Sequence, residues 1–311
     1  MSEHTGIAFR DGAYLPVEDL SISVLDPAFS CSDVVFDAVS VSDGAFFRLD
    51  DHMARFRASC DHVYMTSPYS DAEMMHIMAQ CVDRAGLSDA LVLALCTRGR
   101  FSDGHVKGDP RFCENEFIAY AVPYYTTVPE SCARDGVHLW VAETRRAPNA
   151  AIDQRAKNFN RMDLTRAQFE ALNAGADAPL LCSTEGYIAE GPGFNLWLLR
   201  GREALTPRDN LLEGITRKTV FDLCAEAGLE AKAADLTPAD LDDADEMFIC
   251  SSAGGLMPVT RLNDKPIGNG APGITTSQLR DLYWRKRTEG WYTTAVADLL
   301  ELSPAHRAIA G

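Results

Sequence analysis

The sequence predicts an α+β fold, and three observations lead to this prediction. Apolar runs of strand length occur at 90–97 and 116–122, and an amphipathic helical pattern occurs at 72–85. These elements are intermixed without the regular strand–helix alternation of a doubly wound sheet. The chain has 311 residues, more than one domain of typical size. We expect a smaller N-terminal α/β domain and a larger, strand-rich C-terminal domain.

The N-terminal part shows two hairpins and a helix. Residues 8–16 alternate around an Asp-Gly turn and predict a hairpin, and residues 39–48 predict a second one. From Asp50 onward, apolar residues such as Met53 and Phe56 follow helical spacing. These elements precede the helix at 72–85 and the two strands, so we place residues 1–122 in the small N-terminal domain.

Residues 123–135 carry two prolines among mixed polar residues and are interpreted as an interdomain linker. The large C-terminal domain is expected at 136–311 and begins with a strand at 138–143. Short strands separated by glycine turns, a helix with one apolar face and a buried strand follow it. The expected strands are 180–182, 186–189, 194–199 and 246–250, and the expected helix is 214–227.

Composition narrows the possible partners. The formal net charge is −16, which argues against nucleic acid and anionic membranes because both bind clustered positive charge. The nine cysteines include no C-x-x-C pair and no spacing typical of zinc. The N-terminus does not read as a signal peptide, and no apolar run reaches membrane-spanning length. We therefore expect a cytoplasmic protein with reduced thiols and no metal.

Two residues suggest chemistry. Lys157 is one of only six lysines and lies in an uncharged Asn/Phe/Asn context. A lysine can form a Schiff base with an aldehyde cofactor. Glu190, in the sequence Glu-Gly-Pro-Gly-Phe-Asn, is a carboxylate that can keep a pyridine nitrogen protonated. Taken alone, a lysine is more often an ordinary surface charge, so the case depends on the motifs that accompany Lys157.

Two loops and one arginine are suited to binding a phosphate. Gly214 precedes the helix at 214–227, whose first N–H groups lack helical partners and favour an anion. The stretch 251–255, Ser-Ser-Ala-Gly-Gly, offers further N–H groups and hydroxyls after a strand. Arg55 can clamp phosphate oxygens in a bidentate manner. The alternatives are a simple helix cap for the glycine and a solvated arginine paired with Asp51.

Together these motifs resemble those of the class IV aminotransferases, which are pyridoxal-phosphate enzymes of fold type IV. The resemblance covers roughly residues 8–294. The segments 43–52 and 253–260 are most similar to the (R)-selective amine transaminases within that family. The motifs that carry the resemblance are 190–195, 214–217 and the pair His52 and Arg55.

The resemblance implies a role for each matching residue. Lys157 would form the Schiff base with pyridoxal 5'-phosphate and shuttle the proton, and Glu190 would pair with the ring nitrogen. Leu212 would pack on the ring face. The family also implies a homodimer or a larger even assembly. The expected phosphate ligands are Arg55, Ile215, Thr216, Ser251 and Ser252.

The substrate pocket is where the sequence departs from the amine branch. Cys31 and Phe36 stand where that branch carries histidine and tyrosine, and Arg161 stands in place of a tryptophan. Arg161 is interpreted as an ion-pair partner of Asp163 or Glu190, with binding of a substrate carboxylate as the alternative. Ala253 is a further candidate substrate-binding residue. On the loop at 98–107, which also has the composition of a flexible lid, the candidates for binding a keto-acid carboxylate are Arg100, His105 and Lys107.

The expected function is transfer of an amino group from an (R)-amine to a keto acid such as pyruvate by a ping-pong route, with the cofactor passing through its pyridoxamine form. The alternatives are a D-amino-acid transaminase and a branched-chain L-amino-acid transaminase. A lyase of the same fold, of the aminodeoxychorismate type, is less favoured. A relative that binds the cofactor without turnover is disfavoured because both Lys157 and Glu190 are present.

Overall fold

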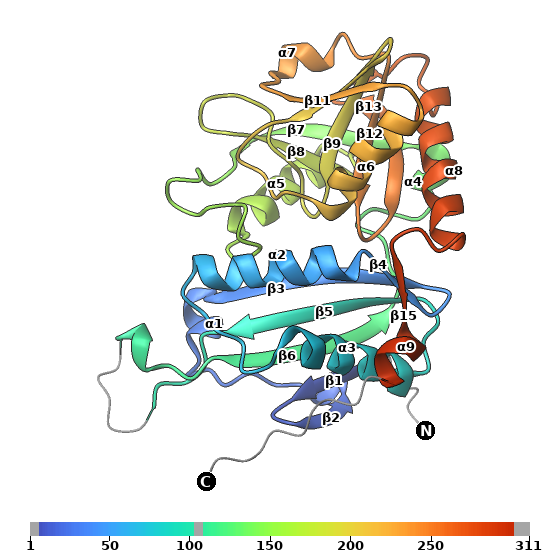
Figure 1. Cartoon of the computed structure of the whole chain (residues 1–311). Helices are drawn as coiled ribbons and strands as arrows, with labels where there is room; N and C mark the ends of the chain where they lie inside the picture. The colour runs from blue at the N-terminus through green and yellow to red at the C-terminus, as the bar shows by residue number, and fades with distance from the viewer. Residues whose placement is uncertain (1–5, 103–107, 302–311) are drawn as a thin grey trace. The chain divides into compact units, whose positions relative to one another are not determined.

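The computed structural model describes residues 6–102 and 108–301 of the chain (Figure 1). The chain divides into two compact units, described separately below. The lysine-bearing segment Ala156–Phe159 belongs to the first unit, although we expected Lys157 within a C-terminal domain at 136–311. Unit 1 contains the chain up to Tyr124, Ala156–Phe159 and the segment from Tyr292 on, and unit 2 contains Tyr125–Arg155 and Asn160–Trp291.

Unit 1 is built on an antiparallel sheet whose described strands follow the order β15-β4-β3-β5-β6-β1-β2. The two predicted hairpins are confirmed as β1–β2 and β3–β4. The elements are β1 (Ile7–Arg10), β2 (Ala13–Pro16), the 3-10 turn η1 (Val17–Asp19), α1 (Pro27–Cys31), β3 (Val34–Ser42), β4 (Ala45–Phe47), α2 (Leu49–His62), α3 (Asp71–Ala85), β5 (Ala90–Thr97), the 3-10 turn η2 (Pro110–Phe112), β6 (Glu116–Pro123), β15 (Thr293–Ala295) and α9 (Val296–Glu301).

One apolar core holds unit 1 together. Helices α2 and α3 contribute Phe56 and Met78 to it, and β3 and β5 contribute Val39 and Val92. All eight residues of β5 are buried, as expected for a central strand with an uninterrupted apolar sequence. This packing fixes α2 against β3, and α2 carries Arg55.

The segment Ala156–Phe159 joins unit 1 at the edge of β3. Of the residues of β3, only the last ones pair with β4. The earlier residues on this edge of β3 can therefore pair with another segment. Phe36 donates its N–H to the Lys157 carbonyl at 2.9 Å, and Phe159 donates to the Val34 carbonyl at 3.3 Å. Lys157 and Phe159 are thereby aligned with the sheet, although they are far from β3 in sequence.

Unit 2 contains a mixed sheet whose described strands follow the order β11-β10-β9-β12-β13-β7-β8, with β14 paired to β13. Parallel pairs join β10 to β11 and β7 to both β13 and β8, and the other pairs are antiparallel. The elements are α4 (Cys132–Asp135), β7 (Val137–Arg145), α5 (Met162–Asn173), β8 (Ala178–Cys182), β9 (Asn195–Arg200), β10 (Glu203–Pro207), α6 (Ile215–Glu226), β11 (Glu230–Ala234), α7 (Pro238–Leu241), β12 (Glu246–Ser251), β13 (Gly255–Leu262), β14 (Lys265–Pro266) and α8 (Ile274–Thr288).

Helices cover the sheet of unit 2. α6 and α8 pack against β12, α8 also packs against β13, and α5 packs against β7 and β8 (Figure 1). Trp197 of β9 is fully buried. Its ring lies parallel to that of Phe248, with 6.1 Å between the ring centroids, and contacts Phe221 of α6 edge-on, with 4.9 Å between the centroids. The strand expected at 186–189 is wrong: this segment makes a single bridge, Cys182 to Ile188, because the turn through Gly186 intervenes.

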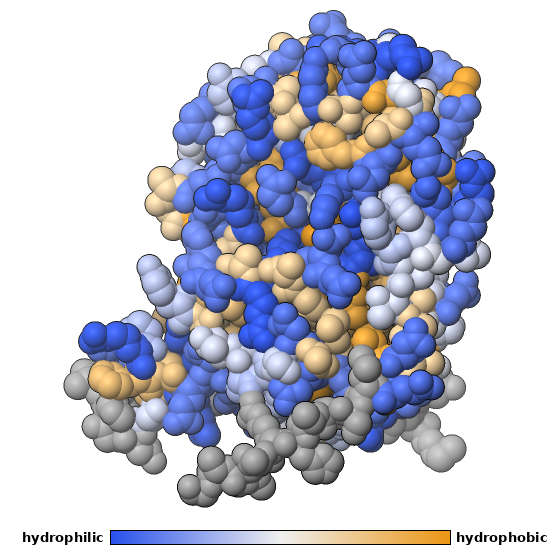
Figure 2. Space-filling view, in the orientation of Figure 1, coloured by the Kyte–Doolittle hydropathy of each residue, from blue (hydrophilic) through white to orange (hydrophobic). Residues whose placement is uncertain are grey.

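On the face shown in Figure 2, hydrophilic residues are interspersed with smaller groups of apolar ones. None of the helices in the described ranges combines the length and apolar character needed to cross a membrane. Within the same ranges, no group of three or more His, Cys, Asp or Glu side chains is arranged to hold a metal ion.

Candidate functional site

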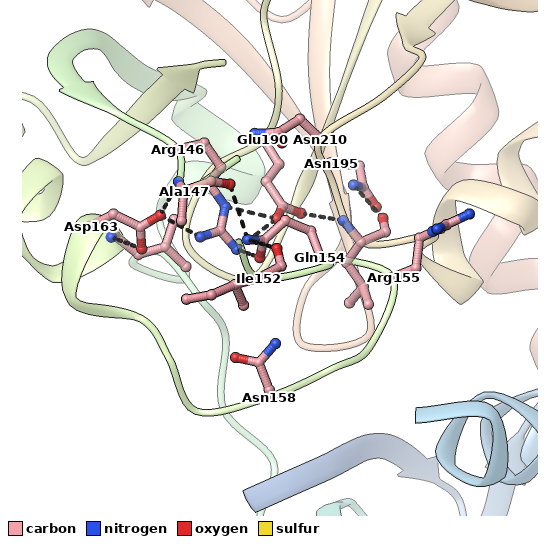
Figure 3. Close-up of polar contacts among 12 residues, drawn as sticks. Arg146, Ala147, Ile152, Gln154, Arg155, Asn158, Asp163, Glu190, Asn195 and Asn210 are labelled. Carbon is pink, nitrogen blue, oxygen red and sulfur yellow. Dashed lines mark hydrogen bonds and ion pairs between the residues drawn. The ribbon is translucent and has the colours of Figure 1, made fainter. Parts of the chain in front are cut away.

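Glu190 lies in a buried hydrogen-bond network of unit 2 (Figure 3). Its side chain is 6% exposed. Its backbone carbonyl accepts the Leu181 N–H at 3.0 Å, which ties the turn to β8. The following Gly191 admits no side chain, because a Cβ there would lie 2.1 Å from Cζ of Phe194. The Glu-Gly-Pro-Gly-Phe sequence therefore sets the position of the carboxylate.

Arg146 is the principal partner of Glu190. Its Nε and one terminal nitrogen both donate to Glu190 Oε1 at 3.1 Å. Its other terminal nitrogen donates to Asp163 Oδ2 at 2.5 Å, and Gln154 Oε1 accepts a further bond at 2.5 Å. The Ala147 N–H also donates to Asp163, at 2.9 Å. The arginine is thus held from three directions, which orients the carboxylate it binds.

Glu190 has room for one further donor. A carboxylate offers about four acceptor positions. Within the described chain, Arg146 supplies two donors at Oε1, and the Leu212 N–H supplies one at Oε2, at 3.0 Å. The remaining position at Oε2 suits a protonated ring nitrogen. The residues present therefore fit the pyridine ring that the sequence resemblance implies.

Leu212 connects this carboxylate to the predicted phosphate loop. Its N–H binds Glu190, and its carbonyl accepts Nδ2 of Asn195 at 3.0 Å. Gly214 lies against the same asparagine, and a Cβ at this glycine would come within 2.1 Å of Asn195 Oδ1. A short, fixed turn thus leads from the Glu190 contact to the start of α6.

The start of α6 is available to an anion. Gly214 is the N-cap residue, and no side chain caps the helix. The amides of Ile215 and Thr216 belong to the first turn, where helical N–H groups have no internal acceptor. The start of α8, by contrast, is capped by Glu246, which accepts the N–H groups of two threonines. The geometry agrees with a phosphate site at α6.

The second phosphate loop follows β12. The Ser251 hydroxyl donates to the Gly193 carbonyl at 2.7 Å and accepts the Ala253 N–H at 3.1 Å. Ser251 therefore shapes the turn, and Ser252, which is half-buried, is the better candidate for contacting a ligand. Ala253 is buried, and its carbonyl accepts the Thr127 N–H at 3.0 Å, so its role in the structure is to close this loop.

Lys157 is anchored through its backbone in unit 1. Its carbonyl pairs with β3, and its N–H donates to the hydroxyl of Ser59 on α2 at 3.0 Å. The Nζ atom lies 4.5 Å from the ring centroid of Phe36. Phe36 also contacts Phe159, with ring centroids 4.8 Å apart. The structure therefore brings the predicted lysine and the predicted pocket residue Phe36 together.

A buried charged cluster lies beside Lys157. Asp37 binds Arg55 through two bonds of 2.8 Å and His52 Nδ1 at 2.7 Å. His52, Arg55 and Ser59 recur on one face of α2 at spacings of three and four residues. Asp51, the partner of Arg55 in the alternative interpretation, binds Arg48 at 2.7 Å. The carboxylate that orients Arg55 is Asp37 of strand β3. Helical spacing alone did not indicate this partner.

Burial controls the protonation of this cluster. Burial lowers the pKa of His52, and the charge of Asp37 opposes that change only in part. Burial alone would raise the pKa of Asp37, but Arg55 and His52 together hold it below its usual range. Nearby Lys157 also disfavours a charged His52. The cluster therefore favours a neutral histidine beside an ionised aspartate.

The other predicted pocket residues are less clearly grouped. Cys31 is exposed at the end of α1, and its Sγ lies 3.6 Å from the Ser30 hydroxyl. Arg100 is exposed and contributes its carbonyl to a bond with the Glu114 N–H at 3.1 Å. His105 and Lys107 lie outside the described residues. The preceding Arg98 is buried and bound to Asp33, at 2.8 Å, so it holds the base of the loop.

Arg161 does not form the ion pair we expected. Asp163 and Glu190 are instead bound by Arg146. Within the described residues, no hydrogen bond or ion pair of the half-buried Arg161 guanidinium occurs. Burial lowers the pKa of Arg161, and the neighbouring Glu190 opposes this. As N-cap of α5, the arginine also opposes the helix dipole, so its position gives no evident benefit to stability.

Comparisons with known proteins show the family to which the chain belongs. The sequence model of the family described as Amino-transferase class IV matches residues 34–262. A branched-chain-amino-acid aminotransferase of Pseudomonas aeruginosa is 27% identical, over 91% of this chain and 94% of its own length. A D-alanine aminotransferase of Bacillus licheniformis is 28% identical, over 87% and 93%. The structure of a branched-chain amino acid aminotransferase of Thermobaculum terrenum in its PLP form superposes with a TM-score of 0.83 at 25% identity, covering 95% of this chain and 99% of that one.

Replacing Arg146 tests the network around Glu190. Arg146→Met leaves the buried Glu190 and the half-buried Asp163 without their main partner, so we expect a loss of about 3–5 kcal/mol in the free energy of unfolding. Denaturant titration measures this loss. The control is Arg145→Met at the exposed neighbouring position, for which we expect a change within about 0.5 kcal/mol. Equal effects of the two changes would contradict the assignment.

The His52 cluster predicts acid sensitivity. Because the pKa of His52 is lowered from 6.5 on folding, the unfolded chain binds a proton that the folded chain excludes. The contribution of neutral His52 to the free energy of unfolding is then fully present above pH 6.5 and is lost as the pH falls below that value. In His52→Gln, unfolding measured across this range should show a shallower decline. Identical pH profiles for both proteins would rule out a buried neutral His52.

Proposed function

Because this chain belongs to the class IV aminotransferase family, we propose that it transfers an amino group between an α-amino acid and an α-keto acid, with pyridoxal 5'-phosphate as cofactor. The observation that carries the proposal is the Glu190 carboxylate. It is fixed by Arg146 and the Leu212 N–H and retains one acceptor position at Oε2. The family match and the uncapped start of α6 support the same cofactor.

Each described residue contributes placement or proton transfer. When bound, the cofactor supplies an electron sink for the carbanion that forms at the substrate carbon. Lys157 would provide the amine that holds the cofactor through its aldehyde, with loss of water, and that amine would carry the proton between the substrate carbon and the cofactor carbon. Glu190 would accept the ring N–H. Ile215, Thr216 and Ser252 would donate to the phosphate, and Arg55, oriented by Asp37, would be a further donor.

Arg161 favours a substrate with a carboxylate. It is a half-buried cation close enough to Glu190 for their charges to interact, and no acceptor pairs with its guanidinium within the described chain. Such a group gains most from an anionic ligand, because a charge-assisted bond compensates for its lost hydration. The relatives named above act on branched-chain amino acids and D-alanine by their names, which agrees with an amino-acid donor. An (R)-amine remains the alternative donor.

A half-reaction tests the transaminase proposal. Loaded with cofactor, the protein should absorb visible light, and D-alanine or L-leucine should bleach this absorbance. A response to (R)-1-phenylethylamine alone would support the amine alternative. Lys157→Ala should lose the response to every donor, because no amine remains to exchange. Wild-type turnover by that variant would contradict the mechanism, and pyruvate release without a keto-acid acceptor would indicate a lyase.

Arg161→Met tests the substrate class. Removing a charge-assisted bond should reduce kcat/KM for amino acids and keto acids by about 10- to 100-fold. The value for an amine without a carboxylate should change little. Arg166→Met, at an exposed arginine of the same helix, is the control. An equal loss for substrates with and without a carboxylate would remove Arg161 from carboxylate recognition.

The assembly belongs to the same proposal. We expect a homodimer or a larger even assembly, as the family resemblance implies, with a small-molecule amino donor and acceptor as ligands besides the cofactor. Light scattering that shows a fully active monomer would contradict this part of the proposal without affecting the chemistry.

A further inference from the structure

Arg217 ends the sequence motif at 214–217 but has no part in the proposed cofactor contacts. It lies in the first turn of α6, and its side chain is 6% exposed. Its Nε donates to the Thr206 hydroxyl at 3.1 Å. One terminal nitrogen donates to the Glu213 carboxylate at 2.8 Å, and the other donates to the Pro207 carbonyl at 2.9 Å. One buried guanidinium therefore joins the end of β10 to the start of α6.

Thr206 extends this connection to the next strand of the sheet. It is fully buried, and its hydroxyl donates to the Leu196 carbonyl of β9 at 2.8 Å. Arginine can only donate, so the hydroxyl oxygen accepts from Arg217 while the hydroxyl hydrogen points at Leu196. Hydrogen bonds in series strengthen one another in a buried site. The first turn of α6 is thereby tied to β9 as well as to β10.

Asn195, the first residue of β9, holds the other end of the same turn. Its Nδ2 donates to the Leu212 carbonyl at 3.0 Å, and its Oδ1 lies against Gly214. Residues 212–217 are therefore fixed to neighbouring strands at both ends. Because the Leu212 N–H also binds Glu190, this turn links the position of the carboxylate to that of the first amides of α6.

The charge of Arg217 is unfavourable for the helix alone. A cation in the first turn opposes the helix dipole, whereas an acidic residue there is stabilising. The first turns of α2, α3 and α5 contain acidic residues, and that of α6 contains none. Glu213 precedes the helix and offsets the charge from an exposed position. An anion bound at the start of α6 would compensate for this arrangement, so the placement of Arg217 agrees with a phosphate site.

We propose that Arg217 and Thr206 are positioning residues that hold the amides of Ile215 and Thr216 in place for the cofactor phosphate. This inference rests on the proposed function, since it needs a phosphorylated ligand at the start of α6. Neither side chain has to touch that ligand, because Arg217 donates to three protein acceptors and Thr206 is fully buried. Their contribution is a turn that needs little reorganisation when the phosphate binds.

Comparing pyridoxamine 5'-phosphate with pyridoxamine tests this role. The two compounds differ only in the phosphate, and as amines neither attaches to Lys157, so the full-length apoprotein would be titrated with each. Thr206→Val keeps the shape of the side chain and removes its hydroxyl. In this variant the dissociation constant for pyridoxamine 5'-phosphate should rise roughly 10-fold, and that for pyridoxamine should stay unchanged. Arg208→Met, at an exposed arginine next to Pro207, is the control and should change neither value.

A conservative variant separates position from charge. Arg217→Lys keeps the positive charge but cannot reach three acceptors, so it should show the same selective loss for the phosphorylated compound. Full wild-type discrimination in Arg217→Lys would overturn the positioning role. An equal loss of affinity for both compounds in Thr206→Val would also overturn it, because general loosening of the fold does not select for the phosphate.

A double-mutant cycle tests whether the two side chains act together. Thr206→Val should have little further effect on phosphate discrimination in an Arg217→Lys background. Fully additive effects would contradict the proposal. A wild-type protein that binds both compounds equally would refute the phosphate site itself. Selective wild-type binding that persists in every variant would refute only the role of Arg217 and Thr206.

Discussion

The ion pair between Arg146 and Glu190 is the interaction on which the site in unit 2 depends. It joins the end of β7 to the turn after β8, and Asp163 extends it to α5. Through the Leu212 N–H, the same carboxylate also fixes the approach to α6. One buried carboxylate therefore sets the distance between the position suited to a ring nitrogen and the loop suited to a phosphate.

The lysine is held by a different constraint. Lys157 comes from the middle of the chain, but its backbone is bound by β3 and by Ser59 of α2. The neighbouring Asp37 orients Arg55 on the same helix. Each unit thus provides a rigid support of hydrogen-bonded backbone and buried ion pairs. Preorganised groups of this kind cost little reorganisation when a ligand binds.

Sequence reasoning succeeded where local pattern determines the structure. The uninterrupted apolar run of β5 and the amphipathic helix α3 were predicted from residue periodicity alone. Lys157 and Glu190 could be named as candidates because their motifs are short and contiguous, and their roles stay predictions. At 186–189 the pattern failed, because a turn through Gly186 takes precedence over the apolar residues beside it.

The support of the site could not be predicted in this way. Arg146 and Glu190 are far apart in sequence, and nothing in the residues around Arg146 distinguishes it from exposed Arg145. Arg161 was expected to pair with Asp163 or Glu190, but Arg146 binds both carboxylates. Such choices among equivalent charges are decided by tertiary packing.

The most direct test of the central claim is nitrogen NMR of the protein loaded with pyridoxal 5'-phosphate that carries a labelled ring nitrogen. If Glu190 is the acceptor at Oε2, the chemical shift should be that of a protonated pyridine nitrogen, and Glu190→Gln should move it toward the unprotonated value. An unprotonated ring nitrogen in the wild-type protein, or a protonated one that does not respond to Glu190→Gln, would contradict the account.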